Sequence, residues 1–145
     1  MEKVSTIHGQ KFENDVEDIL IKNKVKYIKN YVVRTVSGKR KIDFVVFTKI
    51  GRVFIEVKYR EVNGDNARKR MAAESLFIVM YEYKQLFPGE QLVGIVNDLQ
   101  ILMPGAQNYI SLLASIGVEV FGFKDGNPDD LLLRKIEEIK LLGLV

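Results

Sequence analysis

The sequence contains no cysteine and only one histidine, His8, in 145 residues. The lack of cysteine excludes disulfides and thiolate metal sites, and one histidine is too few for a histidine-rich zinc site. A bound metal must therefore be held by carboxylate and carbonyl oxygens, which favour a hard cation such as Mg²⁺ or Mn²⁺. No apolar run approaches the roughly 18 residues of a membrane-spanning helix, and the first ten residues include no apolar segment of signal-peptide type. We therefore expect a soluble, cytoplasmic protein with no membrane partner.

The length and the hydrophobic content of 47% are typical of one globular domain over residues 1–145. The net charge of +3 is unevenly distributed. Residues 1–70 hold 17 Lys/Arg and 9 Asp/Glu, a balance of +8, whereas residues 71–145 hold 5 and 10, a balance of −5. This asymmetry favours a polyanionic partner for the first half of the chain. A solvated surface with uneven charge is the alternative interpretation.

Hydrophobic periodicity predicts four helices and five strands. The first helix is expected to begin near Gly9, with a core-facing stripe formed by Phe12, Val16, Ile19 and Leu20. Strands are predicted at residues 27–33, 42–48, 52–58, 92–96 and 118–123, with a polar basic turn at residues 37–41. The second helix is predicted to start after residues 63–65 and to end at Pro88-Gly89. The third and fourth helices are predicted to start at Pro104-Gly105 and at Asn127-Pro128.

The first three strands follow one another closely enough to form an antiparallel meander, and right-handed crossovers make the last strands parallel. The predicted fold class is therefore α/β. It consists of a mixed five-stranded β-sheet flanked by helices on both faces, in the order α-β-β-β-α-β-α-β-α.

Three charged residues stand inside the apolar strands of the meander. In the strand at 52–58, alternation places Glu56 and Lys58 on one face, side by side at the end of the strand. Asp43 lies among apolar neighbours in the preceding strand, and a hairpin between the strands would bring it near Glu56. Buried charges are costly unless they are paired or used.

A divalent cation between Asp43 and Glu56 would remove their mutual repulsion, lower the pKa of a bound water and polarise a phosphoryl oxygen. Lys58 could orient the attacking hydroxide or stabilise charge on the phosphate. The carbonyl of Val57 is a candidate third metal ligand because it lies between the two charged side chains. The set is sufficient to hydrolyse a phosphodiester, although an exposed Glu–Lys pair on an edge strand is the competing structural interpretation.

Ile42-Asp43, twelve intervening residues and Glu56-Val57-Lys58 resemble the motif of the PD-(D/E)XK nuclease superfamily, with Ile42 in place of the family's proline. The segment from Gly9 to Glu13, followed by Arg34 and Ser37-Gly38, resembles the pattern of archaeal Holliday-junction resolvases within that superfamily. The resemblance implies a restriction-endonuclease-like core and a Mg²⁺-dependent endodeoxyribonuclease. It also implies that Arg34 and Ser37 contact DNA, and that Glu13 supplies a further acid for catalysis and metal binding.

Helix geometry places Glu13 at the margin of the buried stripe, where its side chain could reach a site at the edge of the sheet. Asp15 lies at the opposite margin, so this geometry does not choose between them. An ordinary first-turn acid favoured by the helix dipole is the alternative for Glu13.

Basic residues flank the candidate site in sequence and could follow a nucleic-acid backbone. They are Lys39, Arg40, Lys41, Arg60, Arg68, Lys69 and Arg70. Any one of them could equally be a solvated surface charge.

Branched DNA and linear duplex both stay open as substrates, and a DNA-binding or assembly module without cleavage is the alternative function. A resolvase must cut two strands symmetrically, so we expect a homodimer. The apolar residues of helix 129–142 or of segment Leu99–Met103 are candidate interfaces.

Overall fold

The computed structural model describes residues 4–48, 51–60, 66–102, 106–123, 132–135 and 137–138. The helices are α1 (Val4–Lys22), α2 (Asn66–Leu86) and α3 (Ala106–Ser115), with one 3₁₀ helix, η1 (Leu99–Leu102). The strands are β1 (Tyr27–Thr35), β2 (Gly38–Phe47), β3 (Arg52–Lys58), β4 (Gln91–Val96) and β5 (Val118–Gly122). Residues 132–135 and 137–138 are also helical.

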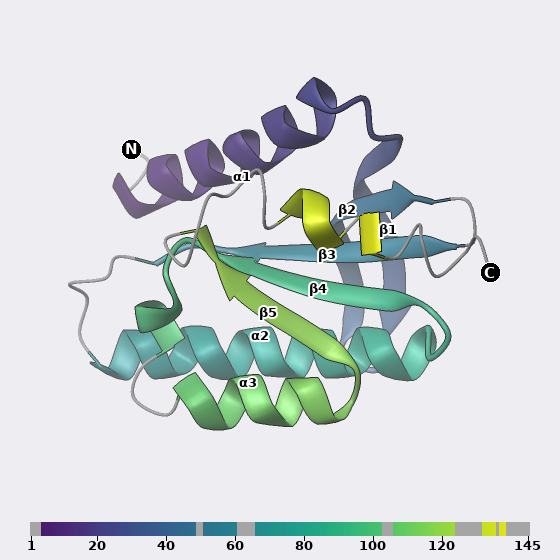
Figure 1. Cartoon of the computed structure of the whole chain (residues 1–145). Helices are drawn as coiled ribbons and strands as arrows, with labels where there is room; N and C mark the ends of the chain where they lie inside the picture. The colour runs from purple at the N-terminus through teal and green to yellow at the C-terminus, as the bar shows by residue number, and fades with distance from the viewer. Residues whose placement is uncertain are drawn as a thin grey trace.

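The five strands form one mixed sheet in the order β1-β2-β3-β4-β5. β1, β2 and β3 pair antiparallel, whereas β3, β4 and β5 pair parallel. Helix α1 and the helical residues after position 131 cover one face, and α2 and α3 cover the other (Figure 1). The predicted fold class is confirmed, including the meander and the parallel arrangement of the last strands.

Several predicted boundaries were wrong. Helix α1 begins at Val4 rather than near Gly9. The basic segment at residues 37–41 is mostly strand, because β2 begins at Gly38 and the hairpin turn is limited to residues 36–37. Gly38 has a φ of 115°, which a residue with a side chain rarely adopts. The expected helix starts at residues 63–65, 104–105 and 127–128 lie outside the described residues.

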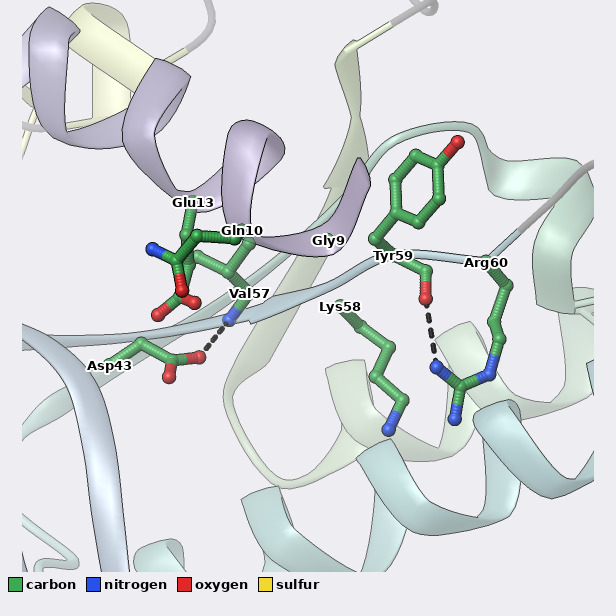
Figure 2. A pocket seen from close by; sticks show the side chains of 8 residues that line it. All are labelled: Gly9, Gln10, Glu13, Asp43, Val57, Lys58, Tyr59 and Arg60. Carbon is green, nitrogen blue, oxygen red and sulfur yellow. Dashed lines mark hydrogen bonds between the residues drawn. The ribbon is translucent and has the colours of Figure 1, made fainter. Parts of the chain in front are cut away.

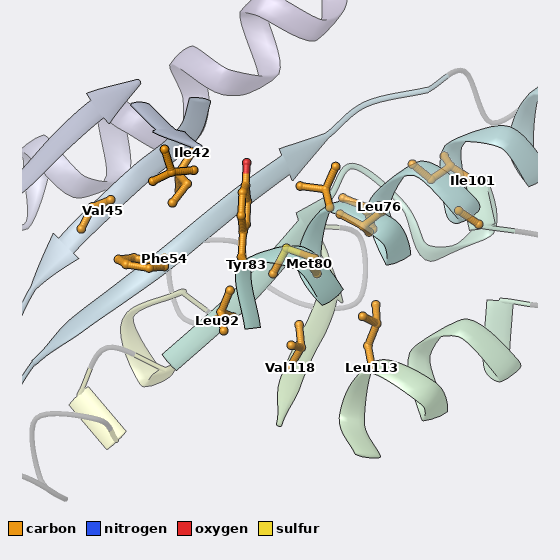
Figure 3. Packing of buried hydrophobic residues seen from close by; sticks show 14 residues of the cluster. Ile42, Val45, Phe54, Leu76, Met80, Tyr83, Leu92, Ile101, Leu113 and Val118 are labelled. Carbon is orange, nitrogen blue, oxygen red and sulfur yellow. The ribbon is translucent and has the colours of Figure 1, made fainter. Parts of the chain in front are cut away.

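Each face of the sheet has its own hydrophobic cluster. The cluster under α1 includes the predicted stripe of this helix, together with strand residues such as Phe44 and Ile55. The cluster under α2 and α3 includes Ile42, Phe54, Met80 and Tyr83 (Figure 3). Because buried hydrophobic side chains cover both of its faces, β3 is enclosed and its polar side chains have limited access to water.

The regular pairing of β1 and β2 is interrupted at one pair of residues, Asn30 and Asp43. Their register continues on both sides of Asn30 and Asp43, but these two residues do not pair, and Asn30 has a φ of 56°. On β2, Ile42 and Val45 both pack in the cluster under α2, whereas Phe44 packs under α1. The alternation of side chains between the two faces is therefore broken at Asp43, so this side chain does not occupy a regular strand position on either face.

One residue in each of the two segments expected to form a dimer interface is buried within the domain. Ile101 of η1 and Leu132 are 0% and 1% exposed in the described structure and belong to the two core clusters. Residues 129–131, 136 and 139–142 lie outside the described residues, so the dimer interface stays a prediction. Separately, no helix in the described part of the chain is long and apolar enough to cross a membrane.

Packing of α1 on the sheet can be tested with two adjacent aliphatic residues of similar size, Leu20 and Ile21. Leu20 is fully buried, whereas Ile21 is 57% exposed. We expect Leu20→Ala to lower the free energy of unfolding by about 2–5 kcal/mol and Ile21→Ala to lower it by less than about 1 kcal/mol. Urea denaturation followed by circular dichroism measures both. Equal losses would contradict the observed orientation of α1.

Candidate active site

Asp43 and Glu56 face each other where β2 and β3 separate. The backbone ladder between these strands ends at the pair Phe44 and Ile55, one residue before them. Beyond it, the Asp43 amide donates to the Glu56 carboxylate at 3.4 Å, and the Val57 amide donates to the Asp43 carboxylate at 2.7 Å. The predicted proximity of Asp43 and Glu56 is thus observed, and it takes the form of two side-chain-to-backbone hydrogen bonds.

The side chains of β3 alternate as expected, but both of its faces lie against helices. Val57 packs with the cluster under α1, whereas Phe54, two positions before Glu56, belongs to the cluster under α2. Glu56 and Lys58 extend toward α2 along a face that is apolar until the strand ends.

Glu13 completes the acidic group from the other side of the sheet. It lines the same pocket as Asp43, Val57 and Lys58, a cavity of about 310 Å³ that also borders Gly9, Gln10, Tyr59 and Arg60. Figure 2 shows Glu13 descending from α1 toward Asp43. Asp15 is exposed and does not line this pocket, so of the two acids on α1 Glu13 is the one beside Asp43.

Burial and mutual repulsion shift the titration of the two strand carboxyls. Desolvation raises the pKa of Asp43 to about 7, the hydrogen bond from Val57 opposes this shift, and the charge of Glu13 adds to it. Desolvation and the charge of Asp43 raise the pKa of Glu56 well above its ordinary value. Carboxyl groups in such surroundings favour either a proton or a bound cation near neutral pH.

Lys58 is half-buried at the end of β3. Desolvation lowers the pKa of Lys58, as does the charge of Arg60, while Glu56 and Asp43 oppose the shift. Lys58 makes no ion pair within 4 Å to any described carboxylate, so its ammonium is near the acids without being neutralised by one of them. In Figure 2 the Lys58 and Arg60 side chains extend to the same side of β3, away from Glu13.

The oxygen donors fit a divalent cation that keeps part of its water shell. No group of three or more carboxylate, histidine or cysteine side chains in the described structure could hold a metal ion. The expected trio of Asp43, Glu56 and Glu13 is therefore not a closed set of direct ligands. Mg²⁺ commonly takes only one or two carboxylates and several waters, so such an ion could be held by Asp43 and Glu56, with Glu13 accepting a hydrogen bond from one of its waters.

The residues expected to bind nucleic acid divide into three groups. Arg60 lines the pocket. Arg40 and Ser37 are instead bound to Glu82 of α2, Arg40 by an ion pair of 3.1 Å, so they fasten the β1–β2 hairpin to this helix. Arg34, Lys39, Lys41 and Arg70 do not line the described pocket, and Arg68 and Lys69 belong to the first turns of α2.

Gln10, Tyr59 and Asn97 belong to the surroundings of the site and were not identified from sequence. Gln10 lies one turn before Glu13 on α1, so helical spacing was an available signal. Tyr59 contacts the ring of His8, which is exposed within α1 rather than before it. Asn97 bonds to the backbone of Arg60 across 37 residues, a contact with no local sequence signal.

No family model and no curated protein sequence matches the chain. A solved protein of unknown function, AF1548, aligns over 79% of this chain and 58% of its own, with a TM-score of 0.52 and 16% identity. SfsA from Pyrococcus furiosus, solved in complex with Ca²⁺, aligns over 79% and 55%, with a TM-score of 0.42 and 17% identity. The chain thus spans little more than half the length of either protein. The likeness to AF1548 shows a shared fold.

The raised pKa of Asp43 predicts a change of stability with pH in the metal-free protein. A carboxyl whose folded pKa exceeds its unfolded value stabilises the fold below the unfolded pKa of about 4, and that stability is lost as the pH rises through about 7. Asp43→Asn keeps an oxygen for the Val57 amide and removes the charge. We therefore expect this variant to melt several degrees higher than the wild type at pH 8 in EDTA and at nearly the same temperature at pH 4.

Differential scanning fluorimetry across this pH range measures the effect. Asp15→Asn is the matched control, because it removes an exposed carboxylate from α1 and should leave the pH profile unchanged. A lower melting temperature of Asp43→Asn at pH 8 would show that the Asp43 charge is not destabilising.

Proposed function

We propose that the chain is a metal-dependent endodeoxyribonuclease of the PD-(D/E)XK type, with Asp43, Glu56 and Lys58 as its catalytic residues. The observation that carries this proposal is the separation of β2 and β3, where Asp43 of β2 and Glu56 of β3 occupy the gap and Lys58 follows Glu56 on β3. The motif resemblance and the α/β fold agree with this arrangement. Glu13 is proposed as the third acid and the fourth residue of the site, because it borders the same pocket as Asp43 and Lys58.

Asp43 and Glu56 would hold a Mg²⁺ or Mn²⁺ ion, with the Val57 carbonyl as a further donor. The amide and carbonyl of one strand residue point to the same side, so the Val57 carbonyl faces the gap into which its amide donates. A bound cation of this kind supplies Lewis acidity and lowers the pKa of a coordinated water. Lys58 would then orient the attacking water or stabilise charge on the phosphate, and Glu13 would accept a hydrogen bond from a water in the pocket.

Branched DNA and linear duplex are both proposed substrates, and the homodimer stays a prediction. Symmetric cutting of a junction needs two sites related by a twofold axis. One cleavage assay can distinguish between these substrates and can also show whether the chain is an enzyme or only a DNA-binding module. Four-way junction, flap, single-stranded and plasmid DNA are incubated with Mg²⁺, Mn²⁺ or EDTA, and the products are resolved on denaturing gels.

We expect Lys58→Ala and Asp43→Ala to reduce cleavage by at least about 100-fold, because each removes a group needed in the transition state. Lys26→Ala is the matched control. Lys26 lies at the other end of the sheet, where its carbonyl accepts from Phe47, whose partner on β3 is Arg52. Retained binding with no cleavage by the wild type on any of these DNAs would support the non-catalytic alternative. Full activity of either site variant in both metals would eliminate the mechanism.

Metal binding has a readout that does not depend on activity. A ligand that binds only the folded state raises the melting temperature with concentration. We expect Mn²⁺ to raise the melting temperature of the wild type at pH 8, and Glu13→Gln to weaken this response by several-fold in apparent Kd. Asp15→Asn should respond like the wild type. An equal response from Glu13→Gln would remove Glu13 from the metal environment while leaving Asp43 and Glu56 in place.

A further inference from the structure

The chain beyond the last residue of β3 is held by a side chain rather than by a strand. The parallel ladder between β3 and β4 ends at the pair Lys58 and Val96. Asn97 is the first residue after β4. Its side-chain oxygen accepts from the Arg60 amide at 3.2 Å, and its side-chain nitrogen donates to the Arg60 carbonyl at 3.0 Å. A primary amide offers both a donor and an acceptor, so Asn97 replaces the peptide group that a longer β4 would provide.

This two-point contact fixes the backbone from which the Arg60 side chain leaves. The guanidinium turns back along the strand and donates from Nη1 to the Tyr59 carbonyl at 3.0 Å. Figure 2 shows this bond and the guanidinium beside the Lys58 ammonium. Without a fixed backbone, the exposed side chain of Arg60 would distribute its charge over many positions around the end of β3.

Arg60 is also equipped to take an anionic ligand. It lines the pocket shared by Asp43, Glu13 and Lys58. A guanidinium carries five N–H donors, and only one is used in a described hydrogen bond. No described carboxylate lies within 4 Å of it, in contrast to Arg40 and Arg52, which are each paired with a glutamate. Its planar donors match a phosphate in a bidentate arrangement.

We propose that Arg60 binds a phosphate of the nucleic-acid backbone next to the bond that is cut, and that Asn97 is a positioning residue that holds Arg60 for this contact. This inference rests on the proposed nuclease function. The ligand class is a polynucleotide phosphate, which distinguishes Arg60 from Arg40, whose charge is used inside the fold.

The experiment measures the affinity for a fluorescently labelled DNA duplex and a four-way junction as a function of salt, with Ca²⁺ in place of Mg²⁺. Each phosphate contact contributes close to one unit to the slope of log K against log salt. We expect Arg60→Ala to reduce this slope by about one and the affinity by roughly tenfold. Asn97→Ala should cause most of the same loss, whereas Arg60→Lys should keep the slope because it keeps the charge.

The double variant Arg60→Ala/Asn97→Ala distinguishes positioning from general stability. If Asn97 acts through Arg60, the double variant binds like Arg60→Ala alone. Additive losses, or a wild-type slope in Asn97→Ala, would overturn the positioning role. Lys26→Ala should keep the wild-type slope, and melting temperatures identify any variant whose fold is damaged.

The outcomes also separate this inference from the proposed activity. If the wild type binds DNA with these slopes but never cleaves in Mg²⁺ or Mn²⁺, the nuclease proposal fails and the phosphate contact stands. If the wild type cleaves but Arg60→Ala keeps both its slope and its KM, the phosphate contact fails and the nuclease proposal stands. Absence of salt-dependent binding by the wild type overturns the phosphate contact.

Discussion

The candidate site depends on two backbone amides that lose their strand partners where β2 and β3 separate. Buried amides must be bonded, and here the carboxylates of Asp43 and Glu56 accept from them in place of backbone carbonyls. These bonds offset part of the cost of burying the acids, and they fix both side chains before any ligand binds. The carboxylate oxygens that the amides do not use are therefore held in one place.

The helices on both faces determine what surrounds these two acids. Helix α1 carries Glu13 to one side of the gap, through a stripe that packs on the sheet. On the other side, α2 places the Tyr83 hydroxyl 3.3 Å from the Lys41 carbonyl. Burial and the charges of Glu56 and Asp43 raise the pKa of Tyr83, so this hydroxyl stays neutral and donates a hydrogen bond beside the acids. The two hydrophobic cores thus also hold the site's polar groups in position.

The sequence allowed the sheet, its helices and the Asp43–Glu56–Lys58 group to be predicted because each depends on local periodicity and on the short β2–β3 connection. The basic run at residues 37–41 was misread as a turn, since a strand can carry charged residues when their side chains reach solvent or a distant partner. For Arg40 that partner is Glu82, 42 residues away. Asn97 and Arg60 are similarly far apart, and no periodic pattern marks a contact that depends on the packing of whole elements.

β3 pairs antiparallel with β2 on one side and parallel with β4 on the other. The candidate site therefore has a gap on the β2 side and a continuous strand pairing on the β4 side. Its pairing with β4 continues to Lys58, whereas its pairing with β2 stops at Ile55. Backbone groups of successive residues point to opposite sides of a strand. Because the Val57 amide points into the gap, those of Glu56 and Lys58 point toward β4. The two charged residues are therefore anchored by β4, while Val57 between them leaves the gap open to a ligand. Beyond the last strand pair, the side chain of Asn97 holds the backbone of Arg60, and this contact lies on the β4 side of β3 rather than at the gap.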